Sequence, residues 1–244
     1  MQFPDNEFGT LFGRYLEKAH YKKFRFGLLY FIVVLYLSVP SFNLPLLEYG
    51  HIRISSVMEQ RAMENLLLFY PGQSWVNPGN INPNLLRSVV SMEDGKFFRH
   101  KGIDWEELEK SMKVNKKRRK MARGGSTITM QLAKNLFLRT DKNVFRKAKE
   151  ILIATRMEKE VSKGAILGNY LNVIELGDGI FGVKKASEEF FKKDPKDLSL
   201  NECLRIAAVI PSPLEHKPTD NSPYVLRRVS LIRERYNDII LPKL

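Results

Sequence analysis

Helix-start signals recur along this chain from residue 80 onward, and they constrain its fold more than any other feature. Each signal is an Asn, Asp or Ser placed before a run of apolar residues at helical spacing. We place these signals at Asn82-Pro83, Asp104, Asp141 or Asn143, Ser162, Ser199-Leu200-Asn201-Glu202 and Ser222-Pro223. No convincing alternation of apolar and polar residues predicts strands. The sequence therefore predicts a mainly α-helical body.

The N-terminal part combines a basic tail with an apolar run. Residues 1–25 are polar, with basic residues near their end, and residues 26–47 carry no charge. About 20 apolar residues are needed to span a bilayer, so we expect one transmembrane helix, an uncleaved anchor, over 26–47. The basic tail should then stay in the cytoplasm. A cleaved signal peptide and a buried core helix are the alternatives.

Turn signals divide the rest of the chain. Pro71-Gly72 and Asn77-Pro78-Gly79 predict turns, so we treat 48–80 as a connector and 81–244 as the main domain. The formal net charge is +13, which favours nucleic acid, a phosphate-bearing substrate or an anionic membrane surface as partner. Cys203 is the single cysteine and excludes an internal disulfide, and four scattered histidines make a zinc site a poor prediction.

Glu93 is a candidate acid or base at the end of the first predicted helix. Apolar residues within 85–90 make one face, and Glu93 continues it four residues after Val89. We expect Gly95 to end the helix. A carboxylate that is partly desolvated beside the negative end of a helix dipole has a raised pKa, which suits a general acid or base. The alternative is that Glu93 turns to solvent at a frayed helix end.

The residues around Gly124-Gly125 predict an anion site. Two glycines before a helix expose backbone N–H groups and the positive end of the helix dipole. Thr127, Gln131 and Lys134 share one stripe of that helix, which either lines a cleft or faces solvent. Glu150 lies four residues after Arg146, so it is either a second active-site carboxylate among cations or half of a surface ion pair.

Five motifs occur in one order over residues 80–215. They are Glu93-Asp94-x-x-Phe97-x-x-His100-x-Gly102, Gly124-Gly125-Ser126-Thr127-Ile128-Thr129-Met130-Gln131-x-x-Lys134-Asn135, Arg146-Lys147-x-x-Glu150, Ser162-Lys163-x-x-Ile166-Leu167-x-x-Tyr170-Leu171-Asn172 and Leu198-x-Leu200-x-Glu202. Together they resemble the signatures of the family-51 peptidoglycan glycosyltransferases. The stretch 175–182 is similar to the monofunctional biosynthetic transglycosylases in particular, and Met130 departs from the family, where many members have glutamine. Neither Ser-x-x-Lys nor Lys-Thr-Gly occurs, so we expect no transpeptidase domain.

The resemblance implies a lysozyme-like glycosyltransferase fold, with a large helical lobe and a smaller membrane-associated lobe. It implies polymerisation of lipid II into glycan strands, with inversion at the anomeric centre and release of undecaprenyl pyrophosphate. Glu93 corresponds to the general base. Glu150 corresponds to a second essential carboxylate that orients cations or helps to hold a divalent metal, Mg²⁺ or Mn²⁺. No organic cofactor is implied.

Further residues are implied to bind substrate: Asp94, Phe97, His100, Gly125, Ser126, Thr127, Gln131, Lys134, Asn135, Lys142, Arg146 and Lys149. Within this set, Asp94 and His100 are expected to shape the site and Phe97 to pack beneath it. The implied partners are lipid II, the growing glycan strand, the membrane and cell-wall synthesis proteins, and not nucleic acid. The implied location is the bacterial inner membrane, with one membrane span and the catalytic domain on the periplasmic side. A lysozyme-like hydrolase or lytic transglycosylase and a catalytically idle scaffold are the other classes considered.

Overall fold

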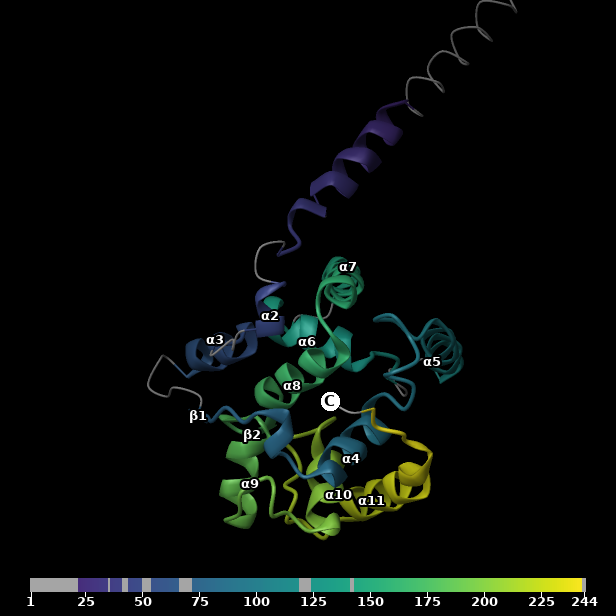
Figure 1. Ribbon diagram of the computed structural model, residues 1–244. Coiled ribbons are helices and arrows are strands. Elements are labelled where there is room, and N and C mark those ends of the chain that lie inside the picture. The colour runs from purple at the N-terminus through teal and green to yellow at the C-terminus, as the bar shows by residue number, and fades with distance from the viewer. Residues whose placement is uncertain are drawn as a thin grey trace, which may run out of the picture. The chain divides into compact units, whose positions relative to one another are not determined.

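The computed structural model describes residues 22–34, 36–40, 44–49, 54–65, 72–118, 124–140 and 143–242 (Figure 1). The chain divides into two compact units, Met1–Val39 and Pro40–Leu244. In the first unit, residues 22–34 are helical and expose large apolar side chains such as Phe26 and Leu29. Among the residues described, no helix has both the length and the apolarity needed to cross a membrane. The predicted anchor over 26–47 lies partly outside the described residues.

The second unit contains one group of helices built around α4 (Pro83–Glu93). Asn82 caps α4 by accepting from the backbone N–H of Asn84 at 2.9 Å, and Pro83 occupies the first helical position, as predicted. The helix ends at Glu93 with Asp94 as its C-cap, directly before the predicted stop at Gly95. Its apolar face is buried against α10 (Leu200–Val209) and α11 (Pro223–Arg235), which begin at the predicted caps Ser199 and Ser222.

A second group of helices forms around α6 (Ile128–Phe137). It contains α7 (Val144–Glu160) and α8 (Lys163–Val173), whose caps are Asn143 and Ser162, together with α3 (Ser56–Glu64). Figure 1 shows this group above α4, α10 and α11, and α5 (Trp105–Arg118) at its side. Within the described residues, the mainly helical class is confirmed.

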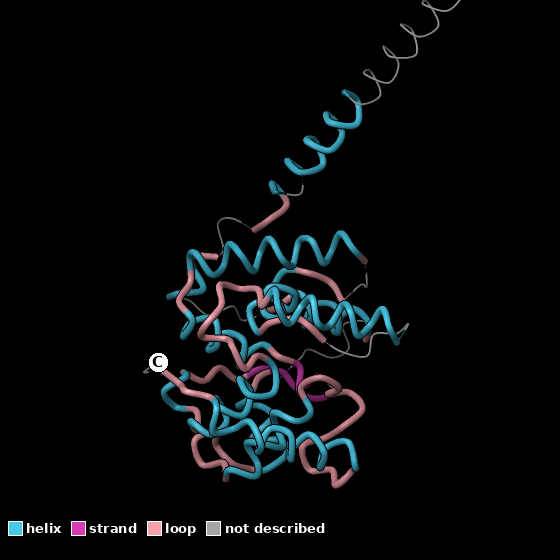
Figure 2. The backbone as a smooth tube through the Cα atoms, turned by 90° about the vertical axis from the view of Figure 1, so that its right-hand side faces the viewer, coloured by secondary structure: helices cyan, strands magenta, loops and turns pink. Residues whose placement is uncertain are grey.

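A small sheet, which the sequence did not predict, lies between the two groups of helices (Figure 2). Its strands are β1 (Gly72–Gln73), β2 (Glu175–Gly177) and β3 (Ile180–Phe181), in the order β1-β3-β2. The β1 strand pairs with β3 in parallel, and β2 pairs with β3 antiparallel. Strands of two or three residues are too short to show a period, so no alternation marked them. The helix α9 (Val183–Phe191) follows β3, and the 3-10 helices η1 (Pro78–Asn80) and η2 (Tyr236–Asp238) complete the unit.

The short helix α2 (Leu46–Tyr49) belongs to the second unit, although its first residues lie within the predicted anchor. Leu44 and Leu47 are buried, and α2 packs on α8. Glu48 accepts from the backbone N–H of Ser162 at 2.7 Å, and Asn169 donates to the carbonyl of Leu47 at 3.0 Å. Residues 44–49 are therefore fixed to the helix that carries Tyr170.

Candidate active site

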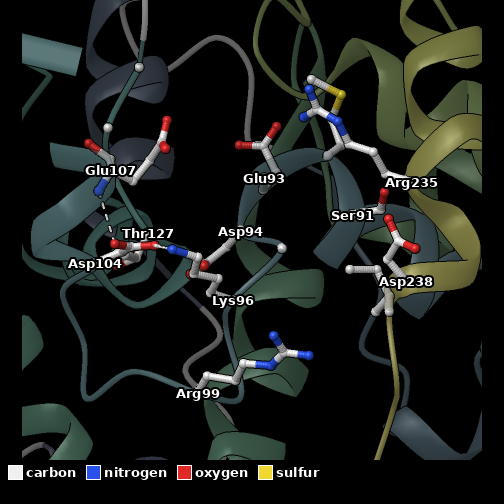
Figure 3. A pocket seen from close by; sticks show the side chains of 16 residues that line it. Ser91, Glu93, Asp94, Lys96, Arg99, Asp104, Glu107, Thr127, Arg235 and Asp238 are labelled. Atoms are coloured by element: carbon white, nitrogen blue, oxygen red, sulfur yellow. Dashed lines mark hydrogen bonds and ion pairs between the residues drawn. The ribbon is translucent and has the colours of Figure 1, made fainter. Parts of the chain in front are cut away.

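A cavity of about 580 Å³ opens where α4 ends. Its walls are the end of α4, the loop after it, the loop before α6, the start of α5 and the segment around η2. Figure 3 shows Glu93 between two walls, with Asp104, Glu107 and Thr127 on one side and Ser91, Arg235 and Asp238 on the other. Most of the side chains named in that figure are charged, so the cavity is suited to a strongly polar ligand.

Glu93 is the last residue of α4, and part of it is exposed to the cavity. Its carboxylate is buried, because Oε1 is shielded from solvent and has no hydrogen-bond partner among the described residues. Burial raises the pKa of Glu93, and Asp94 acts in the same direction. Gln131, Arg228 and Lys134 act in the opposite direction without cancelling the rise. The prediction of a desolvated carboxylate at this helix end is confirmed.

Three helices meet at Glu93 through a chain of hydrogen bonds. Gln131 of α6 donates through Nε2 to Glu93 Oε2 at 2.6 Å. Tyr170 of α8, which is fully buried, donates its hydroxyl to Gln131 Oε1 at 3.0 Å. Gln131 belongs to the stripe of α6 that either lines a cleft or faces solvent, and the structure places it against Glu93.

The side chain of Asp94 binds the N-terminal end of α6. Its Oδ2 accepts from the backbone N–H of Ile128 at 3.0 Å, and both carboxylate oxygens lie 2.9–3.0 Å from His100 Nε2. Thr127 caps the same helix by accepting from the N–H of Met130 at 3.1 Å. The protein's own Asp94 thus occupies part of the helix start that we expected to hold a substrate anion. Asp94 and His100 contact each other at the start of α6, a position that is compatible with the expected role of shaping the site.

Of the two glycines, only Gly125 packs closely against α5. A Cβ on Gly125 would lie 2.9 Å from Ser111 Oγ and 3.2 Å from Leu108 Cα. A Cβ on Gly124 would have nothing within 4 Å. Ser111 also donates to the carbonyl of Gly124 at 2.9 Å. Close approach to α5 therefore explains the second glycine and does not require the first.

Glu150 is buried between two cations of its own helix. Its oxygens accept from Arg146 at 2.5 Å and from Lys147 at 2.6 Å, and Lys147 also donates to Ser126 Oγ at 2.8 Å. A divalent metal does not fit this carboxylate, because each oxygen faces a positive group. In the described ranges, no cluster of three His, Cys, Asp or Glu side chains could hold a metal ion.

Lys134 is a buried cation of α6 that lies near both carboxylates. Its side-chain ammonium has no hydrogen bond or ion pair with any residue that the structure describes. Burial lowers the pKa of Lys134, and Arg146 and Lys147 lower it further, whereas Glu150 and Glu93 favour its charged form. Its ammonium therefore lies in the fields of both carboxylates.

The remaining predicted residues differ in how the structure places them. Phe97 is fully buried under His100 and Lys163, which agrees with the expected packing beneath the site, and its contact with substrate stays a prediction. Asn135 follows Lys134 on α6, and Lys149 precedes Glu150 on α7, both half-buried. Lys142 lies outside the described residues.

Among the residues that contact or influence the two carboxylates, Lys147, Tyr170 and Arg228 were not predicted. Lys147 could have been found, because it is three residues before Glu150 on one helix. Tyr170 and Arg228 carry no such local signal, because they reach the site from α8 and α11. Arg228 lies over the Tyr224 ring, with its guanidinium carbon 4.8 Å from the ring centre, and donates to Met92 Sδ at 3.5 Å.

Comparison with known proteins gives one consistent family. A family model described as Transglycosylase matches residues 60–237. A biosynthetic peptidoglycan transglycosylase of Laribacter hongkongensis is 39% identical over 168 residues, which cover 69% of this chain and 74% of that protein. One from Haemophilus influenzae strain PittEE is 38% identical over 204 residues, covering 82% and 85%. The chain therefore belongs to the transglycosylase family, among the biosynthetic peptidoglycan transglycosylases.

Proposed function

We propose that this cavity is the active site of a peptidoglycan glycosyltransferase that polymerises lipid II into glycan strands. In this reaction the 4-hydroxyl of an acceptor GlcNAc attacks C1 of a donor MurNAc. The glycosidic bond forms as the bond from C1 to undecaprenyl pyrophosphate breaks, and the anomeric centre is inverted. The attacking hydroxyl must lose its proton, so the site needs a base and a means of stabilising the leaving pyrophosphate.

The observation that carries this proposal is the state of Glu93. Its carboxylate lies at the cavity wall, burial raises its pKa, and Oε1 has no hydrogen-bond partner in the part of the chain described. A base with a raised pKa accepts a proton more readily, and an oxygen without a hydrogen-bond partner can accept one from the acceptor hydroxyl. Glu93 would take that proton as the new bond forms.

The cations of α6 and α7 are suited to the leaving group. A pyrophosphate gains negative charge as it departs, and fixed cations stabilise that charge. Lys134 supplies an ammonium with no carboxylate partner among the described residues. Glu150 would hold Arg146 and Lys147 in place through its two short contacts. The surroundings of Glu150 do not fit a divalent metal, so in this proposal Glu150 acts by holding the two cations.

The lipid substrate favours a location at the membrane. We propose that the N-terminal segment attaches the chain to the bacterial inner membrane as a single-pass anchor, with the catalytic body on the periplasmic side. The apolar side chains that residues 22–34 expose support attachment, and so does the charge of +13 beside anionic lipids. The growing glycan strand and cell-wall synthesis proteins are the further partners of this proposal.

Lipid II polymerisation by the full chain and by Glu93→Gln tests the function. We expect wild type to make glycan strands and release undecaprenyl pyrophosphate, and Glu93→Gln to lose at least 100-fold in rate, as removal of a general base typically does. Glu150→Gln should also lose activity, with or without added Mg²⁺ or Mn²⁺. The matched control is Glu109→Gln, which changes an exposed carboxylate paired with Lys113 on α5. Polymerisation that survives Glu93→Gln, or cleavage of preformed strands instead of synthesis, would contradict the proposal.

A further inference from the structure

We propose that Tyr170 and Gln131 are positioning residues that orient the Glu93 carboxylate and leave one of its oxygens free for the acceptor hydroxyl. This inference rests on the proposed function, in which Glu93 is the base. The three side chains come from α8, α6 and α4 and are joined in series. The Tyr170 hydroxyl lies 3.0 Å from Gln131 Oε1, and Gln131 Nε2 lies 2.6 Å from Glu93 Oε2.

Tyr170 fixes the direction of this chain. The two ends of a glutamine amide have nearly the same shape, so its neighbours decide which end faces which group. Burial raises the pKa of Tyr170 well above its usual value, and Glu93 and Asp94 raise it further, so the phenol keeps its proton. A protonated phenol donates to Gln131 Oε1. The NH₂ end of Gln131 must then face Glu93.

The amide donor acts on one carboxylate oxygen and not on the other. Glu93 Oε2 receives the hydrogen bond, whereas Oε1 has no hydrogen-bond partner within the described ranges. An amide turned the wrong way would present its carbonyl oxygen to the carboxylate. That arrangement would repel the charged form of Glu93 and favour its protonated form, which cannot act as a base.

Other charges around Glu93 stay in place when the hydroxyl of Tyr170 is removed. Lys134 faces it from α6 and Arg228 from α11, and Asp94 follows it in the chain. Lys96, Arg99, Arg235 and Asp238 line the cavity beyond. A change of pH dependence in a Tyr170 variant can therefore be assigned to the amide.

The test is the pH profile of lipid II polymerisation for the full chain carrying Tyr170→Phe. Loss of the hydroxyl frees the amide to turn, so the pKa of Glu93 rises. Since activity requires the charged base, the acid limb of the profile should move upward by about one pH unit. The rate at neutral pH should fall about 10-fold and recover at higher pH. A purely structural loss would lower the rate at every pH and leave the limb in place.

Two further variants sharpen the result. Gln131→Met keeps the length of the side chain without its hydrogen bonds, and it should shift the limb in the same direction. The double variant Tyr170→Phe/Gln131→Met should shift it no further than Gln131→Met alone, because Tyr170 acts through Gln131. The control is Ser187→Ala, which removes a buried hydroxyl that donates to the carbonyl of Lys193 at 2.7 Å, at the end of α9 and outside the cavity walls. Its acid limb should stay where the wild-type limb is.

The outcomes separate this inference from the proposed function. An unmoved limb in Tyr170→Phe, or shifts that add in the double variant, would overturn the positioning role while Glu93→Gln remains inactive. An active Glu93→Gln would instead remove the function on which the inference rests. Thermal melting of each variant identifies any that fail to fold, and Gln131→Met then provides the test by itself.

Discussion

In the proposed mechanism, Glu93 can act as a base because burial makes its charged form unfavourable in the folded protein. Burial raises its pKa above the ordinary value of 4.5, so the folded protein binds this proton more tightly than the unfolded chain. Folding stability from this group is therefore highest below that ordinary value. It falls as the pH rises toward the folded pKa, at about 1.4 kcal/mol per pH unit.

Glu93→Gln should therefore stabilise the protein while it abolishes polymerisation. Glutamine has the same shape and no charge, so the penalty at neutral and higher pH disappears. We expect the melting temperature of the variant to exceed that of wild type at neutral pH and the difference to vanish in acid. Melting curves of both proteins over a pH series measure this. A difference that is constant with pH would show that the carboxylate carries no such penalty.

Gly124 and Gly125 make a matched pair for a second prediction. Gly125→Ala places a methyl group against Ser111 and the backbone of Leu108, so we expect a loss of about 1–2 kcal/mol in the free energy of unfolding. Gly124→Ala meets open space and should leave stability unchanged or slightly higher. Urea denaturation of the two variants checks the contrast. Equal losses in both would mean that close packing on α5 does not explain the second glycine.

Site residues could be predicted from the sequence where the spacing of nearby residues indicated their position. Glu93 follows Val89 by one helical turn, and this spacing indicated a buried helix end as one of two possibilities, beside exposure at a frayed end. Tyr170 reads as one more core residue of α8, and only the fold brings its hydroxyl to Gln131. The start of α6 predicted an anion, but it could not show that Asp94 would fill part of that position.

Helix boundaries were predictable because each cap is a local interaction. Asn82, Ser162, Ser199 and Ser222 all accept from backbone N–H groups two or three residues ahead. The small sheet depends on distant contacts instead. Asn172 accepts from the N–H of Val76 at 2.8 Å and donates to its carbonyl at 2.9 Å, which aligns the segment that follows β1. A contact across 96 residues leaves no local pattern to read.

The helix α2 offers the clearest test at the scale of elements. Leu47 is 1% exposed and packs toward α8, whereas Leu46 beside it is 61% exposed. Leu47→Ala should lower the free energy of unfolding by about 2–4 kcal/mol, because it leaves a cavity under the helix. Leu46→Ala, the matched control, should change it by less than about 0.5 kcal/mol. Urea denaturation measures both, and equal effects would show that α2 is not part of the folded body.

At the scale of the whole molecule, two features should act on a membrane in different ways. The net charge of +13 attracts anionic head groups, and salt weakens this attraction within a Debye length. The apolar side chains of residues 22–34 enter the bilayer by the hydrophobic effect, which does not depend on charge. Salt should therefore separate the two contributions.

Flotation of the full chain with neutral and with anionic vesicles checks this separation. At low salt we expect stronger retention on anionic vesicles, and at high salt equal retention on both, because only the apolar contact remains. Leu28 and Ile32 are each about half exposed. Charging them together, in Leu28→Glu/Ile32→Glu, should abolish retention on neutral vesicles while salt-sensitive retention on anionic vesicles persists. A double variant that floats with neutral vesicles as wild type does would show that this helix is not the attachment, and that the lipid substrate is reached by the catalytic body alone.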